Sequence, residues 1–576
     1  MKVAVVGSGV SGLAATWLLN EHSDHEVHLY ESDSRPGGHA NTVHFVPNDR
    51  HGSGIDVDTG FIVLNPTTYP NFLRFLRSFS PRLAKTKRPS RKFSFNQVPS
   101  DNSINEDAGI EVVETEMTFS VTRDGGVFEW AGKNLRTVFC QPHRLLDPQM
   151  WRMLYDVLRF NACARKILVD EQSVQLSIGE YLDREGYSSV FRNNYLIPMT
   201  AAIWSTPPGD CFLSFPAKTL IQFLYNHNLL QITGKPSWLT IKGGSHQYVK
   251  KILSNLPPDQ LHLSTPIKSV QSISTSDGQK PKVVLTTDGD EEHTYDHVIL
   301  ACHSDTALNI LRAGGELTDD EERILGKFQW SHNEVVLHSD EQLMPRSRLA
   351  WSCWNYLSFT KPEASATALE SKNHSDMAEV NRVSLTYGMN DLQHIPEAKY
   401  GPVLVTLNPP FEPDPSKTVG KWHYSHPVLD SQAVQAQKEM LKIQNTRSIS
   451  YAGAYLKYGF HEDGFTSGLL AACSLDKGQE KLPAITSNTA PLPNEIISTN
   501  NITVRPPFEI KHADHHTRLR NSGATFVFYS VVAFLFEIFE GSGLREFFAL
   551  SGSVILTAVG RLVHLQDEVR SDIKLK

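Results

Sequence analysis

The amino-acid sequence predicts an α/β protein, and its first 31 residues give the main reasons. A short apolar run, Lys2–Val6, has the composition of a buried parallel strand. The glycine-rich turn Gly7–Gly12 follows and leads into a helical pattern over Leu13–Asn20. A second strand, Glu26–Tyr30, completes a β-α-β unit of about 30 residues, the size of a dinucleotide-binding unit. We therefore expect the chain to begin with a Rossmann-like fold.

Length and composition exclude several other classes of protein. The chain has 576 residues, of which 40% are hydrophobic and 20% charged, so it can fill a sizeable core. Its formal net charge of −8 argues against a generally basic nucleic-acid-binding protein. The six cysteines include no C-x-x-C pair, which argues against a disulfide scaffold or a zinc ribbon. Only Met1 and Lys2 precede the first apolar run, so no signal peptide is predicted.

The glycine-rich turn has the residues of a dinucleotide site. Gly7 permits a tight turn, Gly9 lets the backbone approach a pyrophosphate, and Gly12 lets helix and strand pack closely. Ser11 lies in the first turn of the predicted helix, whose N–H groups and positive dipole end attract phosphate. Glu31 ends the second strand, where its carboxylate can accept hydrogen bonds from ribose hydroxyls.

Two further motifs resemble those of a known superfamily. The segment Arg35-Pro-Gly37-Gly38-His39 follows Glu31, and its glycine pair suits close approach of the backbone to a cofactor. Together with Glu31 it is similar to the extended motif of the flavin amine oxidase superfamily, which includes phytoene desaturases and protoporphyrinogen oxidases. Near the other end of the chain, residues 452–472 resemble that superfamily's closing FAD motif, on Gly453, Glu462, Asp463 and Gly464. The resemblance implies FAD as the cofactor.

Four more segments narrow the resemblance. They are Asp56–Val63, Met117–Val121, Gly243–Val249 and Tyr458–Gly464. Together they look like a less-characterised branch of predicted NAD/FAD-binding oxidoreductases, whose bacterial members often accompany cyclopropane-fatty-acid synthases. The resemblance covers roughly residues 1–475 and hints at a lipid-like substrate.

The resemblance also implies a domain organisation. An FAD-binding domain would combine residues 1–80, 235–310 and 445–480, and an inserted α+β substrate domain would comprise residues 81–234 and 311–444.

Two smaller expectations accompany this organisation. Ile267 corresponds to a strand position that meets the adenine ring in such proteins. Residues 481–520 are rich in Pro, Ser, Thr and Asn and are predicted to be a linker.

His461 is the candidate catalytic side chain. It lies between the strand that ends near Gly453 and the predicted helix from about Gly464, in the segment expected to face the flavin. An imidazole there could move a proton or polarise a substrate, or it could only bond the loop backbone. Glu462 and Asp463 could contact the ribityl chain or cap the helix.

Aromatic residues suggest a substrate pocket. Trp354, Asn355 and Tyr356 form a compact aromatic and polar group, and Trp204 is a further candidate. Such side chains give a flavin pocket apolar walls with a polar handle, although ordinary core packing explains them equally well. His512, Asp514, His515 and His516 have no second cluster of ligand-type residues, so we expect no metal site.

The C-terminal residues 521–576 contain two uncharged runs, Asn521–Phe536 and Phe547–Gly560. They predict a C-terminal helical hairpin that spans a membrane, lies in its interface, or packs on the body of the protein. Basic residues before the first run, including Arg518 and Arg520, would keep that end cytoplasmic. We expect a protein of the cytoplasm or of the cytoplasmic face of a membrane.

These observations predict an FAD-dependent oxidoreductase that transfers a hydride from an apolar or lipid-like substrate to the flavin. Two alternatives remain open at this point. One is a redox-neutral flavin isomerase, and the other is a non-catalytic FAD-fold partner of a lipid-modifying enzyme. Neither the residues nor the resemblance indicates an oligomeric state.

Overall fold

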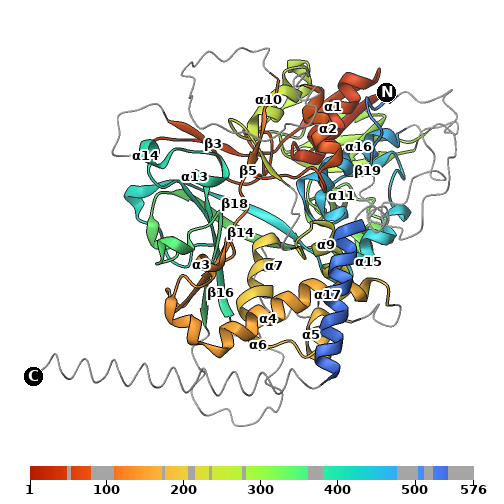
Figure 1. Ribbon diagram of the computed structural model, residues 1–576. Coiled ribbons are helices and arrows are strands. Elements are labelled where there is room, and N and C mark those ends of the chain that lie inside the picture. Colours follow the sequence, from red (N-terminus) through yellow and green to blue (C-terminus); the bar gives the residue numbers. More distant parts are fainter. Residues whose placement is uncertain are drawn as a thin grey trace, which may run out of the picture.

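The computed structural model describes residues 1–47, 54–79, 109–170, 176–204, 215–231, 237–274, 280–360, 380–475, 504–511 and 523–542. Sheets and helices alternate through this part of the chain, which confirms the predicted α/β class (Figure 1).

A five-stranded parallel sheet organises the N-terminal unit. Its strand order is β19-β13-β1-β2-β9, and all neighbouring pairs are parallel. The first two strands have the bounds that the sequence predicts, because Val3–Val6 is a continuous apolar run that is buried throughout. The strands are β1 (Lys2–Val6), β2 (Glu26–Tyr30), β9 (Leu261–His262), β13 (His297–Leu300) and β19 (Ile449–Tyr451).

Helices from both ends of the chain pack beside this sheet. Helix α1 lies against α16, and a Cβ at Gly468 would stand 2.0 Å from the carbonyl oxygen of Ser11, so the two helices can approach this closely only at a glycine. The helices of this unit are α1 (Val10–His22), α2 (Pro70–Ser78), α10 (His246–Leu253), α11 (Ser304–Ala313), α12 (Asp319–Leu325) and α16 (His461–Cys473).

A seven-stranded sheet forms the second layer. Its order is β18-β14-β17-β16-β15-β6-β7, and only the pair β15–β6 is parallel. Strands β6 and β7 form an antiparallel hairpin around Asp124. The strands are β6 (Phe119–Arg123), β7 (Phe128–Ala131), β14 (Gln329–His338), β15 (Trp354–Thr360), β16 (Val380–Gly388), β17 (Leu404–Leu407) and β18 (Thr418–Val428).

The other described strands form three small antiparallel sheets. They are β10 (Ile267–Ile273) with β11 (Lys282–Thr287) and β12 (Glu292–Tyr295), β3 (Thr42–Phe45) with β4 (Ile55–Asp58), and β5 (Val112–Thr115) with β8 (Trp238–Ile241). Strand β4 ends at Asp58, and the chain continues as a loop through Gly60–Val63.

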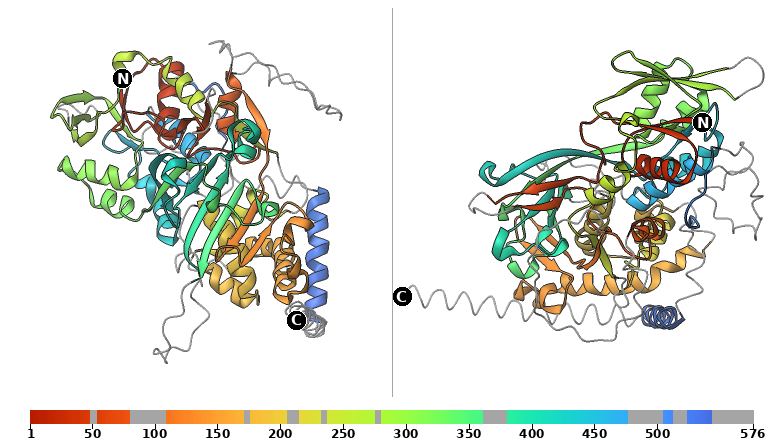
Figure 2. Two further views of the ribbon diagram at one scale, coloured as in Figure 1. Left: turned by 90° about the vertical axis from the view of Figure 1, so that its left-hand side faces the viewer. Right: turned by 90° about the horizontal axis from the view of Figure 1, so that it is seen from above.

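The region from residue 145 to 232 is mostly helical where it is described, and its helices lie on the lower side of the molecule (Figures 1 and 2). The remaining helices before the C-terminus are α3 (Leu135–Val138), α4 (Pro148–Cys163), α5 (Ile178–Arg184), α6 (Ser189–Phe191), α7 (Ile197–Trp204), α9 (Ala217–Asn226), α13 (Met389–Leu392), α14 (Glu397–Tyr400) and α15 (Ser431–Glu439).

Part of the predicted linker is packed rather than extended. Val504 is buried, Phe508 stacks on Trp17 of α1, and Lys511 donates its N–H to Asn71 of α2. These contacts fasten residues 504–511 to the N-terminal unit. The composition of the segment does not reveal them, because the apolar partners lie hundreds of residues away in the sequence.

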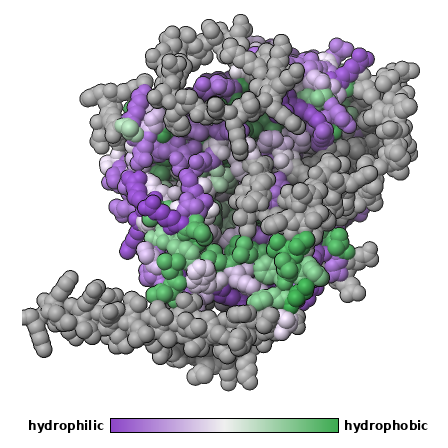
Figure 3. All heavy atoms as spheres, in the orientation of Figure 1, coloured by the Kyte–Doolittle hydropathy of each residue, from purple (hydrophilic) through white to green (hydrophobic). Residues whose placement is uncertain are grey.

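The first predicted C-terminal helix is present as α17 (Gly523–Gly541), which crosses α4 at the edge of the molecule (Figure 2). Figure 3 shows apolar residues gathered on the lower part of the surface. The second run, Phe547–Gly560, lies outside the described residues, so the hairpin stays a prediction. Within the described ranges no helix is both long and apolar enough to cross a membrane, and the spanning alternative is not supported there.

Candidate functional site

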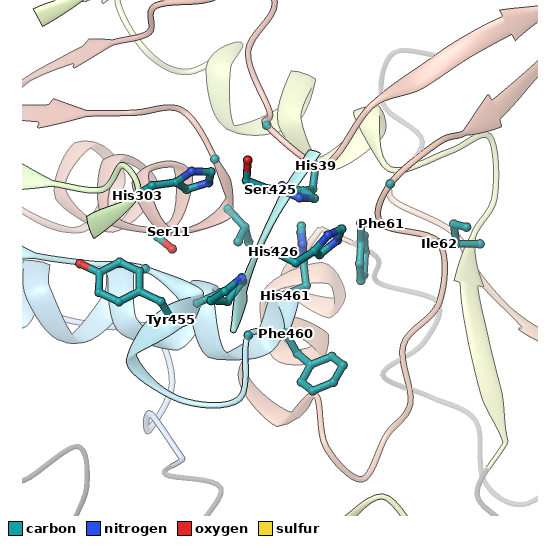
Figure 4. A pocket seen from close by; sticks show the side chains of 18 of the residues that line it. Ser11, His39, Phe61, Ile62, His303, Ser425, His426, Tyr455, Phe460 and His461 are labelled. Atoms are coloured by element: carbon teal, nitrogen blue, oxygen red, sulfur yellow. The ribbon is translucent and has the colours of Figure 1, made fainter. Parts of the chain in front are cut away.

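A cavity of about 490 Å³ lies at the carboxyl ends of the parallel strands (Figure 4). It is lined by Gly7 and Gly9 after β1, by Glu31 after β2, by His303 after β13 and by Gly453 after β19. Open α/β sheets bind their ligands at this edge. Residues of the seven-stranded sheet close the other side of the cavity, among them Trp354, Tyr387 and His426.

The conformation and surroundings of the three glycines agree with a tight turn at Gly7, an open approach at Gly9 and close packing of the helix at Gly12. Gly7 has φ +102°, and a Cβ there would lie 2.9 Å from the carbonyl oxygen of Ala301. A Cβ at Gly12 would lie 1.8 Å from the carbonyl oxygen of Gly7, so any side chain would push helix from strand. A Cβ at Gly9, by contrast, would meet nothing within 4 Å, because this residue faces the open cavity.

The N-terminus of α1 is open toward the cavity. Gly9 is its N-cap, no side chain caps the helix, and its first turn carries no acidic residue. Ser11 lines the cavity, as predicted. The helix therefore presents backbone N–H groups and a positive dipole end to an anionic ligand.

Glu31 braces the same turn. One carboxylate oxygen accepts hydrogen bonds from the Ser8 N–H at 2.9 Å and the Ser8 hydroxyl at 2.6 Å, and the other accepts from the Asp33 N–H at 2.9 Å. Glu31 also lines the cavity, and its contact with a ribose stays a prediction.

Arg35 does not line the cavity in this structure but shapes the loop that does. Its guanidinium donates to the carbonyl oxygens of Gly38 at 2.8 Å, Pro36 at 3.2 Å and Ala40 at 3.3 Å. The loop passes through Gly37 at φ +114° and Gly38 at φ +55°. Gly38 lines the cavity beside Gly9, whereas Gly37 lies behind it.

His461 is the first residue of α16 rather than part of a preceding loop, and it lines the cavity. Its ring stacks on Phe61 with centroids 3.8 Å apart, and its Nε2 shares a hydrogen bond of 2.8 Å with the Tyr248 hydroxyl. Burial lowers the pKa of His461 to about 3, so the imidazole is neutral at physiological pH.

Four more histidines line the cavity: His39, His227, His303 and His426. Only His39 was predicted. Its Nε2 has no hydrogen-bond partner among the described residues, and its pKa is held well below the usual value by burial and by His426. Burial also lowers the pKa of His303 and that of His426, the latter to about 4.

Of two lining histidines that were not predicted, one could have been found from the sequence and the other could not. His303 follows a parallel strand, and the sheet-edge rule could have placed it in the site. His426 lies in β18 of the other sheet, and only the packing of the two layers brings it to within 5.1 Å of His39, measured between ring centroids.

The acidic pair beside His461 caps helices and does not line the cavity. Glu462 accepts hydrogen bonds from the N–H groups of Asn71 and Phe72, both at 2.9 Å, at the start of α2. Asp463 accepts from the Phe460 N–H at 3.0 Å and caps its own helix. Burial raises the pKa of Glu462 to about 8 and that of Asp463 to about 6.

Gly464 and Gly453 have different positions. A Cβ at Gly464 would lie 2.6 Å from the Val10 side chain, so this glycine allows α16 to pack on α1. Gly453 lines the cavity, as predicted.

The predicted substrate pocket is correct for only one of its four residues. Trp354 lines the cavity and stands edge-on to Tyr387. Asn355 is turned away by strand alternation, and its amide bonds the backbone of Ser352 and Thr386. Tyr356 is fully buried in the core of the seven-stranded sheet.

Trp204 and Ile267 also lie outside the lining. Trp204 packs behind Phe223, with ring centroids 4.4 Å apart, and Phe223 itself faces the cavity. Ile267 begins β10 and pairs with Thr287. Both depend on tertiary packing that the sequence pattern does not show.

The residues present fit a dinucleotide. An uncapped helix N-terminus, a glycine whose Cα faces open space and a carboxylate after β2 provide for pyrophosphate and ribose. Three lining side chains also carry buried polar atoms without a partner among the described residues, namely Nε2 of His39, Nε1 of Trp354 and the hydroxyl of Tyr455, a residue that is 2% exposed. Buried polar atoms of this kind call for a ligand.

Comparison with known proteins agrees with this geometry. The family model for flavin containing amine oxidoreductases matches residues 10–475. The fold is similar to that of reduced UDP-galactopyranose mutase, with a TM-score of 0.50 and 16% identity over 82% of this chain and 95% of that chain. It is similar to a putrescine oxidase variant redesigned in cofactor binding, with a TM-score of 0.51 and 13% identity over 82% of this chain and 98% of that chain. No curated protein matches the sequence. The chain therefore belongs to the flavin-containing amine oxidoreductase family, and it is an enzyme whose cofactor is FAD.

Proposed function

We propose that this enzyme transfers a hydride from an uncharged, apolar substrate to its flavin. The observation that carries the proposal is the chemistry of the cavity wall. Among the described lining residues, Glu31 is the sole acidic residue, and none is Lys or Arg. Apolar and aromatic side chains make up much of the remaining wall: Phe61, Ile62, Val63, Met117, Ile203, Phe223, Leu229, Trp238, Trp354, Tyr387 and Phe460.

The missing charges argue against two kinds of substrate. A protonated amine buried in such a site needs a carboxylate partner, and a sugar nucleotide needs Arg or Lys for its phosphates. Glu31 is already engaged by Ser8 and Asp33 at the end of β2. Four of the lining histidines do not supply positive charge, because the pKa values of His39, His303, His426 and His461 are all lowered.

The cofactor and the residues of the chain have different roles in the proposed reaction. When bound, FAD supplies the hydride acceptor. The aromatic wall binds the apolar substrate and keeps water away from the reacting carbon. The neutral imidazole of His461, held by Phe61 and Tyr248, can accept a proton from a substrate hydroxyl or an adjacent carbon.

The experiment compares two substrates that differ only in charge. The purified full chain is first checked for the visible absorption bands of oxidised flavin. It is then mixed without oxygen with a long-chain unsaturated alcohol or with the alkylammonium ion of the same chain. Titrating the flavin spectrum reports binding, and bleaching reports hydride transfer.

Tighter binding and faster bleaching with the alcohol would support the proposal. Preference for the ammonium ion would overturn the assignment of an uncharged substrate. Conversion of the alcohol that requires previously reduced flavin, with no net oxidation, would replace the oxidoreductase by an isomerase.

A further inference from the structure

Helix α17 exposes an uncharged apolar stripe. Val531, Phe534, Leu535 and Ile538 have exposed fractions between 51% and 59%. Their spacing of i, i+3, i+4 and i+7 places them on one side of the helix. A stripe of this spacing normally faces a protein core, whereas here its side chains are exposed, on a helix that lies at the edge of the molecule (Figure 2).

The opposite side of α17 is fixed to α4. Ala533 packs on Ala162, and Phe536 meets Tyr155 with ring centroids 5.5 Å apart. The two acidic residues of the helix are both paired there, Glu540 with Arg159 at 2.7 Å and Glu537 with Lys166. The stripe is therefore the exposed side of a docked helix, whose two carboxylates are paired with Arg159 of α4 and with Lys166 of the 3-10 turn that follows α4.

The apolar surface continues onto α4. Trp151 and Leu158 lie one turn before and one turn after Tyr155, which contacts α17, and their exposed fractions are 44% and 47%. We call these two residues and the four of the stripe the apolar face. Figure 3 shows apolar residues on this lower part of the molecule.

We propose that the apolar face lies in the headgroup and acyl boundary of a lipid bilayer, with α17 parallel to the membrane plane. A helix of 19 residues is roughly 28 Å long, and α17 carries two acidic residues, so it suits the interface better than a transmembrane position. Trp151, which keeps its indole N–H bonded to the Leu145 carbonyl, is a residue type enriched at this depth.

The sequence around α17 favours a lipid surface over a second copy of the chain. Pairing of two α17 helices would cover the stripe but leave Trp151 and Leu158 exposed. The 34 residues after Ser542 include the uncharged run Phe547–Gly560, which adds apolar length next to the helix. Before the helix in the sequence, Arg518 and Arg520 supply positive charge suited to anionic headgroups.

A short series of packed helices connects the apolar face to the cavity. Helix α4 continues into a 3-10 turn, Ala164–Leu168, that packs on α9. Helix α9 supplies Phe223 to the cavity wall, and His227 follows at its end. Helix α4 with its 3-10 turn, and then α9, would thus lie between a bilayer on the apolar face and the cavity, although the proposal does not depend on the substrate proposed above.

Vesicle flotation of the full chain tests the proposal. The probes are phosphatidylcholine vesicles and vesicles that also contain phosphatidylserine. The wild type should float with the vesicles, and more strongly with those that contain phosphatidylserine. The double variant Phe534→Ser/Leu535→Ser should lose at least about tenfold in partitioning, because two large apolar side chains no longer leave water.

A matched control removes a phenylalanine and a leucine elsewhere. Leu349 and Phe411 are 43% and 42% exposed and lie outside the apolar face, so Leu349→Ser/Phe411→Ser should float like the wild type. Both variants must retain the flavin spectrum, which shows that they are folded. Flotation that is equal for both double variants would overturn the proposal.

Size-exclusion chromatography without vesicles distinguishes two other ways in which the apolar face could be covered, by a second copy of the chain or by the rest of this chain. A wild type that does not float but elutes as a dimer, with a monomeric Phe534→Ser/Leu535→Ser variant, would assign the apolar face to a second copy. A monomeric wild type that does not float would mean that the rest of this chain covers the face. Either result would refute the membrane assignment and leave the substrate proposal unaffected.

Discussion

The imidazole of His461 lies flat on the phenyl ring of Phe61, with ring centroids 3.8 Å apart and planes inclined by 10°. Phe61 follows β4 near the N-terminus, whereas His461 begins α16, 400 residues later. Both residues line the cavity. Side chains from near the two ends of the matched range, residues 10–475, therefore contact each other in the cavity wall. The hydrogen bond of His461 to Tyr248 sets the orientation of the ring.

We expect His461→Ala to slow flavin reduction by about 10²-fold or more while FAD stays bound, because a positioned proton acceptor is lost. Tyr248→Phe should cause a smaller loss, since it removes the hydrogen bond and leaves the imidazole. Stopped-flow bleaching measures both rates. A His461→Ala enzyme that is reduced at the wild-type rate would show that the histidine only packs on Phe61.

Two glycine variants separate cofactor binding from folding. Gly9→Val should fold but lose FAD, because its side chain would fill the open space where the backbone meets the pyrophosphate. Gly12→Val should fail to fold stably, because its Cβ alone would lie 1.8 Å from a carbonyl oxygen. Circular dichroism and flavin content measure the two effects. Retention of FAD by Gly9→Val would contradict the proposed course of the cofactor.

Glu462 should matter for stability rather than for chemistry. Glu462→Ala leaves two buried N–H groups of α2 without an acceptor and should lower the free energy of unfolding by about 2 kcal/mol. Glu462→Gln keeps one acceptor oxygen and should lose less. Urea unfolding of the two variants tests this order. A variant that loses FAD at unchanged stability would instead indicate a cofactor contact.

Buried histidines should make the fold sensitive to acid. Burial lowers the pKa of His297 from 6.5 to about 3, so between these values only the unfolded chain binds the proton. Its contribution to stability is present above about pH 6.5 and is lost as the pH falls, by about 2 kcal/mol between pH 7 and pH 5.

The matched variants are His297→Gln, which should lose that part of the pH dependence, and His44→Gln at an exposed position, which should keep it. The free energy of unfolding at pH 7 and pH 5 gives the comparison. If the slope of His297→Gln equals that of the wild type, the imidazole is protonated in the folded protein.

Local patterns were enough to predict much of the cofactor half of the site. The first β-α-β unit, the three glycine roles and the position of Glu31 follow from residues within one short stretch of chain, where sequence spacing sets spatial spacing. The substrate side was predicted less well. Asn355 follows Trp354 directly, and strand alternation turns it to the other face.

The fold class, the family motifs and the residues that suit a dinucleotide at the end of β1 could be predicted from the sequence alone. They depend on backbone conformation and local hydrogen bonds. Three features follow only from the packing of the folded chain. His426 meets His39, Glu462 caps α2 instead of contacting a cofactor, and one side of α17 stays uncovered. Each of these outcomes depends on which surfaces pack together. Packing is set by the burial of apolar area over the whole chain, which no local pattern records.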